Sequence, residues 1–163
     1  MNEAWQRVSA IGFLALFVVL TGCGEDFTAS GPQVDSITID PTTITTSQQG
    51  MTDEFFTVTV QLSGFTEPID IEASEVFYVD ASGQEVPSNS MMRSIDGADA
   101  NGVCADVCTV SFDRIFLNWF AGTPASETPY DIGAEIVSEP GDTGRPSERA
   151  KEVGLAQVTV TEG

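Results

Sequence analysis

The sequence predicts an all-β, antiparallel sandwich that follows a short apolar leader. Three observations favour this fold class. Hydrophobic and polar residues alternate in several short segments, turns rich in Gly, Pro, Ser, Thr and Asp separate those segments, and no segment after the leader keeps a helical period. Because no helices connect the strands, neighbouring strands are expected to run antiparallel. The chain after the leader is long enough for one domain with its own core.

Residues 1–22 form the leader. An apolar run from Val8 to Leu20 follows Arg7 and ends at small residues, as in an export signal with its cleavage site. At about 1.5 Å per helical residue the run spans roughly 20 Å, less than the roughly 30 Å hydrocarbon core of a bilayer. We therefore expect the leader to be cleaved. The alternatives are an ordinary secretory signal with a chance cysteine and an uncleaved anchor.

The end of the leader resembles the signal of bacterial lipoproteins. Such signals carry a Leu, a small residue, Gly or Ala, and then Cys, as Leu20, Thr21, Gly22 and Cys23 do here. The resemblance implies cleavage before Cys23, diacylation of its thiol and acylation of the new amino terminus. Two or three acyl chains would anchor the protein stably, because a single chain binds a membrane only marginally. Gly24 after the cysteine implies the outer membrane or cell surface rather than the inner membrane.

The chain is strongly acidic. Its formal net charge is −19, with 25 Asp and Glu against 6 Lys and Arg. Such charge repels phosphate backbones, which are bound by clustered Lys and Arg, so nucleic acid is excluded as a partner. The acidity could attract divalent cations or basic partners, or simply keep an exported protein soluble.

A tether of residues 23–33 precedes the predicted sandwich of residues 34–163. The tether is small, polar and aperiodic, and ten such residues reach at most about 35 Å. In the clearest strand, one face is formed by Phe56, Val58, Val60 and Leu62. Strands are expected at 34–40 (an edge strand ended by Pro41), 55–62, 69–72, 76–80, 108–120 with a bulge or break near Asp113 and Arg114, 130–136 and 155–161. Long loops are expected at 81–107 and 138–154, the second of which holds Lys151, the only lysine.

These strands resemble those of bacterial immunoglobulin-like domains. The opening strand of such domains has a Val-x-Ser-Ile-x-Ile-x-Pro character, as in residues 34–41, and the penultimate strand begins with Tyr and continues with alternating apolar residues, as in 130–136. The resemblance covers most of residues 34–163 and implies an immunoglobulin-like sandwich. The paired cysteines and Trp spacing of antibody domains are missing, so fibronectin-like and other sandwiches are alternatives.

Catalytic signals are sparse. The chain has no histidine, which removes the usual general base and the usual nitrogen ligand for zinc. Asp70 and Glu72 could act as acid and base on a glycoside, but carboxylates that alternate along a strand usually form its solvated face. We expect no enzyme activity, with a glycoside-acting enzyme as the least favoured alternative.

Cys104 and Cys108 are predicted to form a disulfide. Export places them in an oxidising compartment, where a bridge across three residues is the natural outcome. Closing so small a loop would stabilise the fold by roughly 2 kcal/mol. A redox-active or metal-binding pair is the alternative, although the spacing is not Cys-x-x-Cys and no helix begins nearby.

Two further groups of residues are candidate binding sites. Oxygen-bearing side chains and glycines between 96 and 106 are typical of calcium loops, although the helical calcium-loop pattern is broken. A plain solvated turn is the alternative. Trp119 and Phe120 could line a binding face for a partner or a sugar, or could belong to the core. The candidate calcium ligands are Asp96, Asp99, Asn101 and Asp106.

The sequence therefore predicts a lipid-anchored, extracytoplasmic protein that serves as a non-catalytic binding or structural module. Its expected partners are the membrane, through the lipid anchor, and an envelope protein or glycan. The alternative is a carbohydrate-recognition or calcium-dependent adhesion module. No cofactor other than that calcium ion is expected.

Overall fold

The computed structural model describes residues 31–46, 55–88, 90, 92–115 and 128–162. These residues form nine strands and no helix, so the all-β prediction is confirmed. The strands are β1 (Gln33–Asp40), β2 (Thr43–Thr46), β3 (Phe56–Ser63), β4 (Glu75–Val79), β5 (Glu85–Pro87), β6 (Met92–Asp96), β7 (Cys108–Ile115), β8 (Thr128–Val137) and β9 (Arg149–Glu162).

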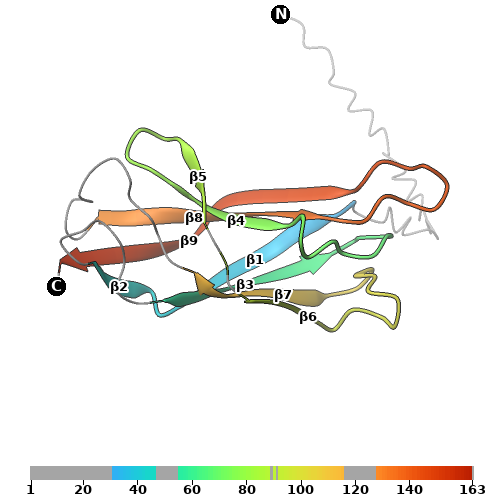
Figure 1. Ribbon diagram of the computed structural model, residues 1–163, viewed down its shortest axis with the longest axis horizontal. Helices are drawn as coiled ribbons and strands as arrows, with labels where there is room; N and C mark the ends of the chain where they lie inside the picture. The colour runs from blue at the N-terminus through green and yellow to red at the C-terminus, as the bar shows by residue number, and fades with distance from the viewer. Residues whose placement is uncertain (1–30, 47–54, 89, 91, 116–127, 163) are drawn as a thin grey trace, which may run out of the picture.

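The strands form two sheets that lie against each other (Figure 1). The four-stranded sheet has the order β1-β3-β7-β6, and each pair of adjacent strands in it runs antiparallel. The five-stranded sheet has the order β2-β9-β8-β4-β5, in which only β2 runs parallel to its neighbour β9. The chain changes sheets between β1 and β2, at Pro41, which has no amide proton to continue the β1 ladder. Strand β1 is an edge strand, as predicted.

The core lies between the sheets and is built from the alternating residues of the long strands. Phe56, Val58, Val60 and Leu62 of β3 are each at most 1% exposed, which confirms the predicted face. On β8 the alternating residues predicted from the sequence are also buried: Tyr130, Ile132, Ala134 and Ile136. There Tyr130 meets Tyr78 of β4 edge to face, with ring centroids 6.0 Å apart.

The predicted irregularity near Asp113 and Arg114 is a β-bulge. The register steps from Phe56 opposite Ile115 to Val58 opposite Phe112, so two residues of β7 oppose one residue of β3. Arg114 takes a positive φ of 55°, which is uncommon for a side chain other than glycine. The bulge keeps both Phe112 and Ile115 in the core.

Three expectations about elements were wrong. Residues 69–72 are not a strand: Ile69 makes a single bridge to Ser138, and a turn follows at 71–73. The loop expected at 81–107 contains β5 and β6, which are short edge strands without a buried row of residues. The loop expected at 138–154 contains the first part of β9, including Lys151.

A bulge interrupts the alternation of residues along β9. The register steps from Val153 opposite Gly133 to Ala156 opposite Ile132, which leaves Gly154 and Leu155 as the bulged residues. Gly154 takes a φ of 80°, a conformation that favours glycine.

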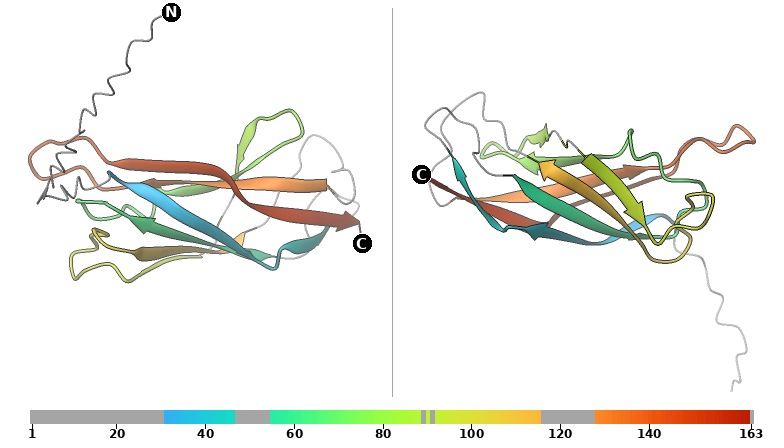
Figure 2. Two further views of the ribbon diagram at one scale, coloured as in Figure 1. Left: turned by 180° about the vertical axis from the view of Figure 1, so that it is seen from behind. Right: turned by 60° about the horizontal axis from the view of Figure 1, so that its bottom comes forward.

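The two ends of the sandwich differ in what they carry. One end gathers the start of β1 and the connections 64–74, 97–107 and 138–148 (right side of Figure 1). We call it the amino-terminal end. The opposite, carboxy-terminal end carries the end of β9, and the 80–84 turn between β4 and β5 lies toward it, as the view from behind in Figure 2 shows.

Candidate functional site

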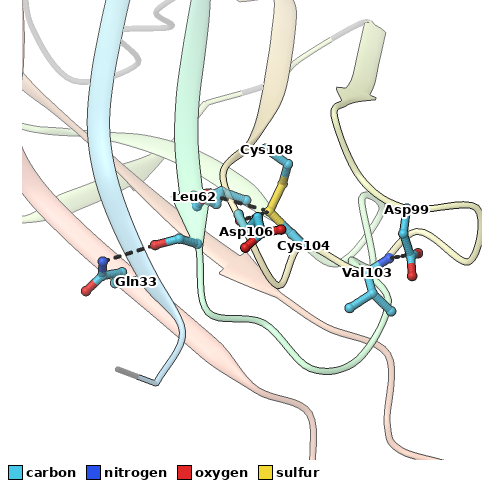
Figure 3. Close-up of a disulfide and its surroundings, with 8 residues drawn as sticks. Gln33, Leu62, Asp99, Val103, Cys104, Asp106 and Cys108 are labelled. Carbon is cyan, nitrogen blue, oxygen red and sulfur yellow. Dashed lines mark hydrogen bonds between the residues drawn. A yellow bond between two sulfur atoms is a disulfide. The ribbon is translucent and has the colours of Figure 1, made fainter. Parts of the chain in front are cut away.

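The disulfide lies at the amino-terminal end of the sandwich (Figure 3). Cys104 and Cys108 are bonded, with their Cα atoms 5.7 Å apart, which confirms the predicted pair. Both are buried, at 1% and 2% exposure, and Sγ of Cys104 lies 3.6 Å from the carbonyl oxygen of Leu62. The bridge therefore holds the 97–107 connection against the end of β3 and the start of β7.

The 64–74 connection is the centre of this end, because backbone hydrogen bonds join it to both neighbouring connections. These bonds hold the three connections in a fixed arrangement, unlike independent loops. They run from Phe65 N to Cys104 O (3.0 Å), Ile69 N to Gly102 O (3.0 Å) and Glu139 N to Pro68 O (2.7 Å). In addition, Asp70 N donates to the carbonyl oxygen of Val137 at the end of β8 (2.9 Å).

The predicted calcium ligands are not gathered into a metal site. Oδ1 of Asp99 accepts hydrogen bonds from the amides of Asn101 (2.8 Å) and Val103 (2.9 Å), so this carboxylate holds its own turn. Asp96 ends β6, and Asp106 is exposed inside the disulfide loop. Within the described ranges, no three His, Cys, Asp or Glu side chains converge as metal ligands would.

The carboxylates considered for glycoside chemistry lie in the turn that precedes β4. Oδ1 of Asp70 accepts hydrogen bonds from the amides of Glu72 (3.1 Å) and Ala73 (3.0 Å). The Glu72 side chain is 93% exposed and lies 3.7 Å from Arg93. Asp70 thus caps a turn, while Glu72 faces solvent. The other candidates, Cys23, Trp119 and Phe120, lie outside the described residues.

Arg93, on the edge strand β6 of the four-stranded sheet, contacts the turn that leads into the other sheet. Its guanidinium donates hydrogen bonds to the carbonyl oxygens of Ile71 (2.8 Å) and Glu72 (2.9 Å), in the turn that leads into β4. The same group lies 5.9 Å from the ring centroid of Phe112. Nothing in the sequence pattern indicated this contact, because β6 and the turn are distant in the chain.

Glu148 connects the 138–148 and 64–74 connections. Its carboxylate accepts hydrogen bonds from the amide (2.8 Å) and hydroxyl (2.6 Å) of Thr66 and from the amide of Glu67 (3.3 Å). Desolvation raises the pKa of Glu148, but these hydrogen bonds and the nearby Arg145 outweigh it, so the net pKa lies below the ordinary value of 4.5.

Replacing Glu148 with glutamine is expected to lower stability at neutral pH by about 1 kcal/mol, because a neutral amide with one acceptor oxygen replaces a charged group with two. The folded-state pKa lies below that of the unfolded chain, so this stabilisation is present above pH 4.5 and is lost as pH falls through the folded-state pKa. Urea unfolding of both proteins at about pH 7 and about pH 3 checks this. The gap between them should close in acid, whereas Glu139→Gln, at an exposed position, should change little. An equal gap at both pH values would contradict the assignment.

A second polar cluster lies on the outer face of the five-stranded sheet, away from the core. Phe77 of β4 is 2% exposed although it points away from the core, because it covers Gly133 of β8. Nζ of Lys151 lies 4.7 Å from the centroid of the Phe77 ring and forms ion pairs with Glu85 and Glu135. The hydrogen bond that Lys151 donates to Glu85, and then the charges of the nearby carboxylates, raise the pKa of Lys151. The sequence pattern did not predict this cluster, because residue 151 was expected in a loop and lies on β9.

The class defined by this geometry is a two-sheet, all-β domain with an interlocked, disulfide-bonded end. No family model matches the chain, and no curated protein matches it either.

In the described parts of the chain, no helix has the length and apolar character that a membrane span requires.

Proposed function

We propose that this chain is a lipoprotein of the bacterial envelope, anchored by acyl groups on Cys23, whose immunoglobulin-like sandwich is a non-catalytic binding or structural module. The observation that carries the proposal is the sequence Leu20-Thr21-Gly22-Cys23 directly after a short apolar leader. Cys23 would keep the domain at the outer membrane or cell surface, where its partner would be another envelope protein or a glycan.

The disulfide supports export. Structural disulfides persist in oxidising compartments and are rare in the cytosol. Cys104 and Cys108 are both buried and packed in the core, as expected of a structural bridge.

The strand order supports the immunoglobulin-like assignment. In immunoglobulin domains one sheet has the order A-B-E-D, and the other contains G-F-C, with C′ added in variable-type domains. Strands β1-β3-β7-β6 follow the first order, and β9-β8-β4-β5 follow the second. Tyr78 on β4 is a buried aromatic on the strand that corresponds to C, where antibody domains carry Trp.

The roles of the acidic side chains support a non-catalytic module. Asp70, Asp99 and Glu148, all at the amino-terminal end, accept hydrogen bonds from backbone amides. Asp70 and Asp99 hold turns within their own connections, and Glu148 links two connections. A fold of this kind implies no particular reaction, so the partner must be found by experiment.

Replacing Cys23 with alanine is expected to abolish membrane association. The wild-type chain should enter the detergent phase and have the intact mass of residues 23–163 plus acyl groups, while Cys23→Ala should stay in the aqueous phase. Ser30→Ala, a small change in the tether, should behave as wild type. Recovery of the wild type from the aqueous phase at the unprocessed mass would refute the proposal.

The binding role is tested with the lipidated wild-type chain in intact envelopes. Crosslinking followed by mass spectrometry is expected to recover a defined envelope protein or glycan fragment that is absent from cells making Cys23→Ala. Reproducible hydrolysis of a glycoside by the purified chain would instead favour an enzyme.

A further inference from the structure

The chain enters the sandwich at its amino-terminal end. Strand β1 begins at Gln33, directly opposite Ser63 at the end of β3, and Nε2 of Gln33 donates a hydrogen bond to Oγ of Ser63 (3.0 Å; Figure 3). The tether therefore joins the domain beside the 64–74, 97–107 and 138–148 connections. Any anchor at Cys23 is attached to this end.

The tether is short compared with the domain. The ten residues from 24 to 33 reach at most about 35 Å. Strand β9 alone has 14 residues, which corresponds to about 46 Å. An anchored domain would therefore keep its amino-terminal end nearer to the bilayer than its carboxy-terminal end.

The same end is strongly acidic. The three connections carry eight carboxylates, and Arg145 is the only cationic side chain in them. Backbone hydrogen bonds and the disulfide hold the segments that carry these charges at the end of the sandwich. Anionic lipid headgroups repel such a surface within about one Debye length, about 8 Å at physiological ionic strength. Five of the carboxylates are on exposed residues: Glu72, Asp99, Asp106, Glu139 and Asp142.

From this placement we infer that the amino-terminal end faces the lipid surface and that its carboxylates hold it away from anionic headgroups. The carboxy-terminal end is then presented outward, where a partner on another surface can reach it. This inference rests on the proposed lipid anchor and adds an orientation to it. It also distinguishes a bilayer-facing surface, built from the interlocked connections, from an outward-facing one.

Energy transfer to a dye on the lipid headgroups tests the orientation. The lipidated protein in vesicles, residues 23–163, would carry a donor at Thr143→Cys, in the 138–148 connection, or at Ala81→Cys, in the turn between β4 and β5. Both positions are exposed. Transfer is expected to be at least about twofold greater from position 143 than from 81, because the domain is longer than the tether span. Equal transfer, or greater transfer from position 81, would overturn the inference.

Vesicles of neutral phosphatidylcholine, with or without anionic phosphatidylglycerol, test the charge effect. Adding the anionic lipid should lower transfer from position 143, and about 1 M salt should reverse the change, since screening then extends only about 3 Å. Two matched variants separate local charge from net charge. Asp142 lies at the amino-terminal end, whereas Asp40 is the last residue of β1, at its opposite end. Replacing either residue with lysine changes the net charge by the same amount. Only Asp142→Lys should reduce the response to anionic lipid.

The outcomes separate this inference from the proposed function. Intact mass that shows no acyl group on Cys23 would refute both. If the protein is lipidated but transfer is greater from position 81, only the orientation is refuted. If the two lysine variants respond equally to anionic lipid, only the electrostatic cause is refuted. Greater transfer from position 143 with a response confined to Asp142→Lys would support the inference.

Discussion

Replacing Gly133 with alanine is expected to destabilise the domain by about 3 kcal/mol. A Cβ atom at this position would lie 2.5 Å from two atoms of the Phe77 ring and 2.8 Å from the backbone carbonyl oxygen of Glu152. Alanine in a strand would ordinarily gain about 0.5–1 kcal/mol over glycine. The clash outweighs that gain, because Phe77 is packed beneath Lys151 and the Glu152 carbonyl lies on the neighbouring strand.

Urea unfolding of Gly133→Ala and the wild-type protein measures this effect. Gly31→Ala is the matched control, because nothing lies within 4 Å of a Cβ there, and it should leave the midpoint unchanged. Adding Phe77→Ala to Gly133→Ala should cost less than the sum of the two single changes, since the ring contact is shared. A Gly133→Ala protein as stable as the wild type would show that Phe77 does not cover residue 133 closely.

Removing the disulfide is expected to cost about 2 kcal/mol, mainly because the unfolded chain regains the freedom that the closed loop restricts. The double variant Cys104→Ala/Cys108→Ala tests this without leaving an unpaired thiol. The loss should be accompanied by faster amide exchange in residues 97–107 and at the start of β7, because the bridge connects these segments.

The wild-type protein unfolded in a strong reductant is the matched comparison for the double variant. Once reduced, it should show the same midpoint as the double variant, while the variant itself should be insensitive to reductant. Both half-cystines are nearly fully buried, so reduction of the folded protein should be slow. A double variant that unfolds at the wild-type midpoint would mean that the backbone bonds of Phe65 and Ile69 hold this end without the bridge.

The strongest sequence predictions concern segments whose local pattern reflects burial. Phe56, Val58, Val60 and Leu62 alternate because each second residue of β3 enters the core, and the β8 row alternates for the same reason. The break at Arg114 was visible because a bulge shifts the phase of that alternation. Cys104 and Cys108 are close in the chain, so their spacing was sufficient to predict a bond.

The amino-acid sequence by itself determined the all-β class, the main core rows and the disulfide, because periodicity and short spacing are local properties. Only the tertiary structure decided that 69–72 is a turn, that β5, β6 and the start of β9 are strands, and that Lys151 covers Phe77. Edge strands and outer faces carry no row of buried residues. Their conformation follows from hydrogen bonds to strands far away in the chain, and the contacts of Arg93 and Glu148 exist only after those strands have come together.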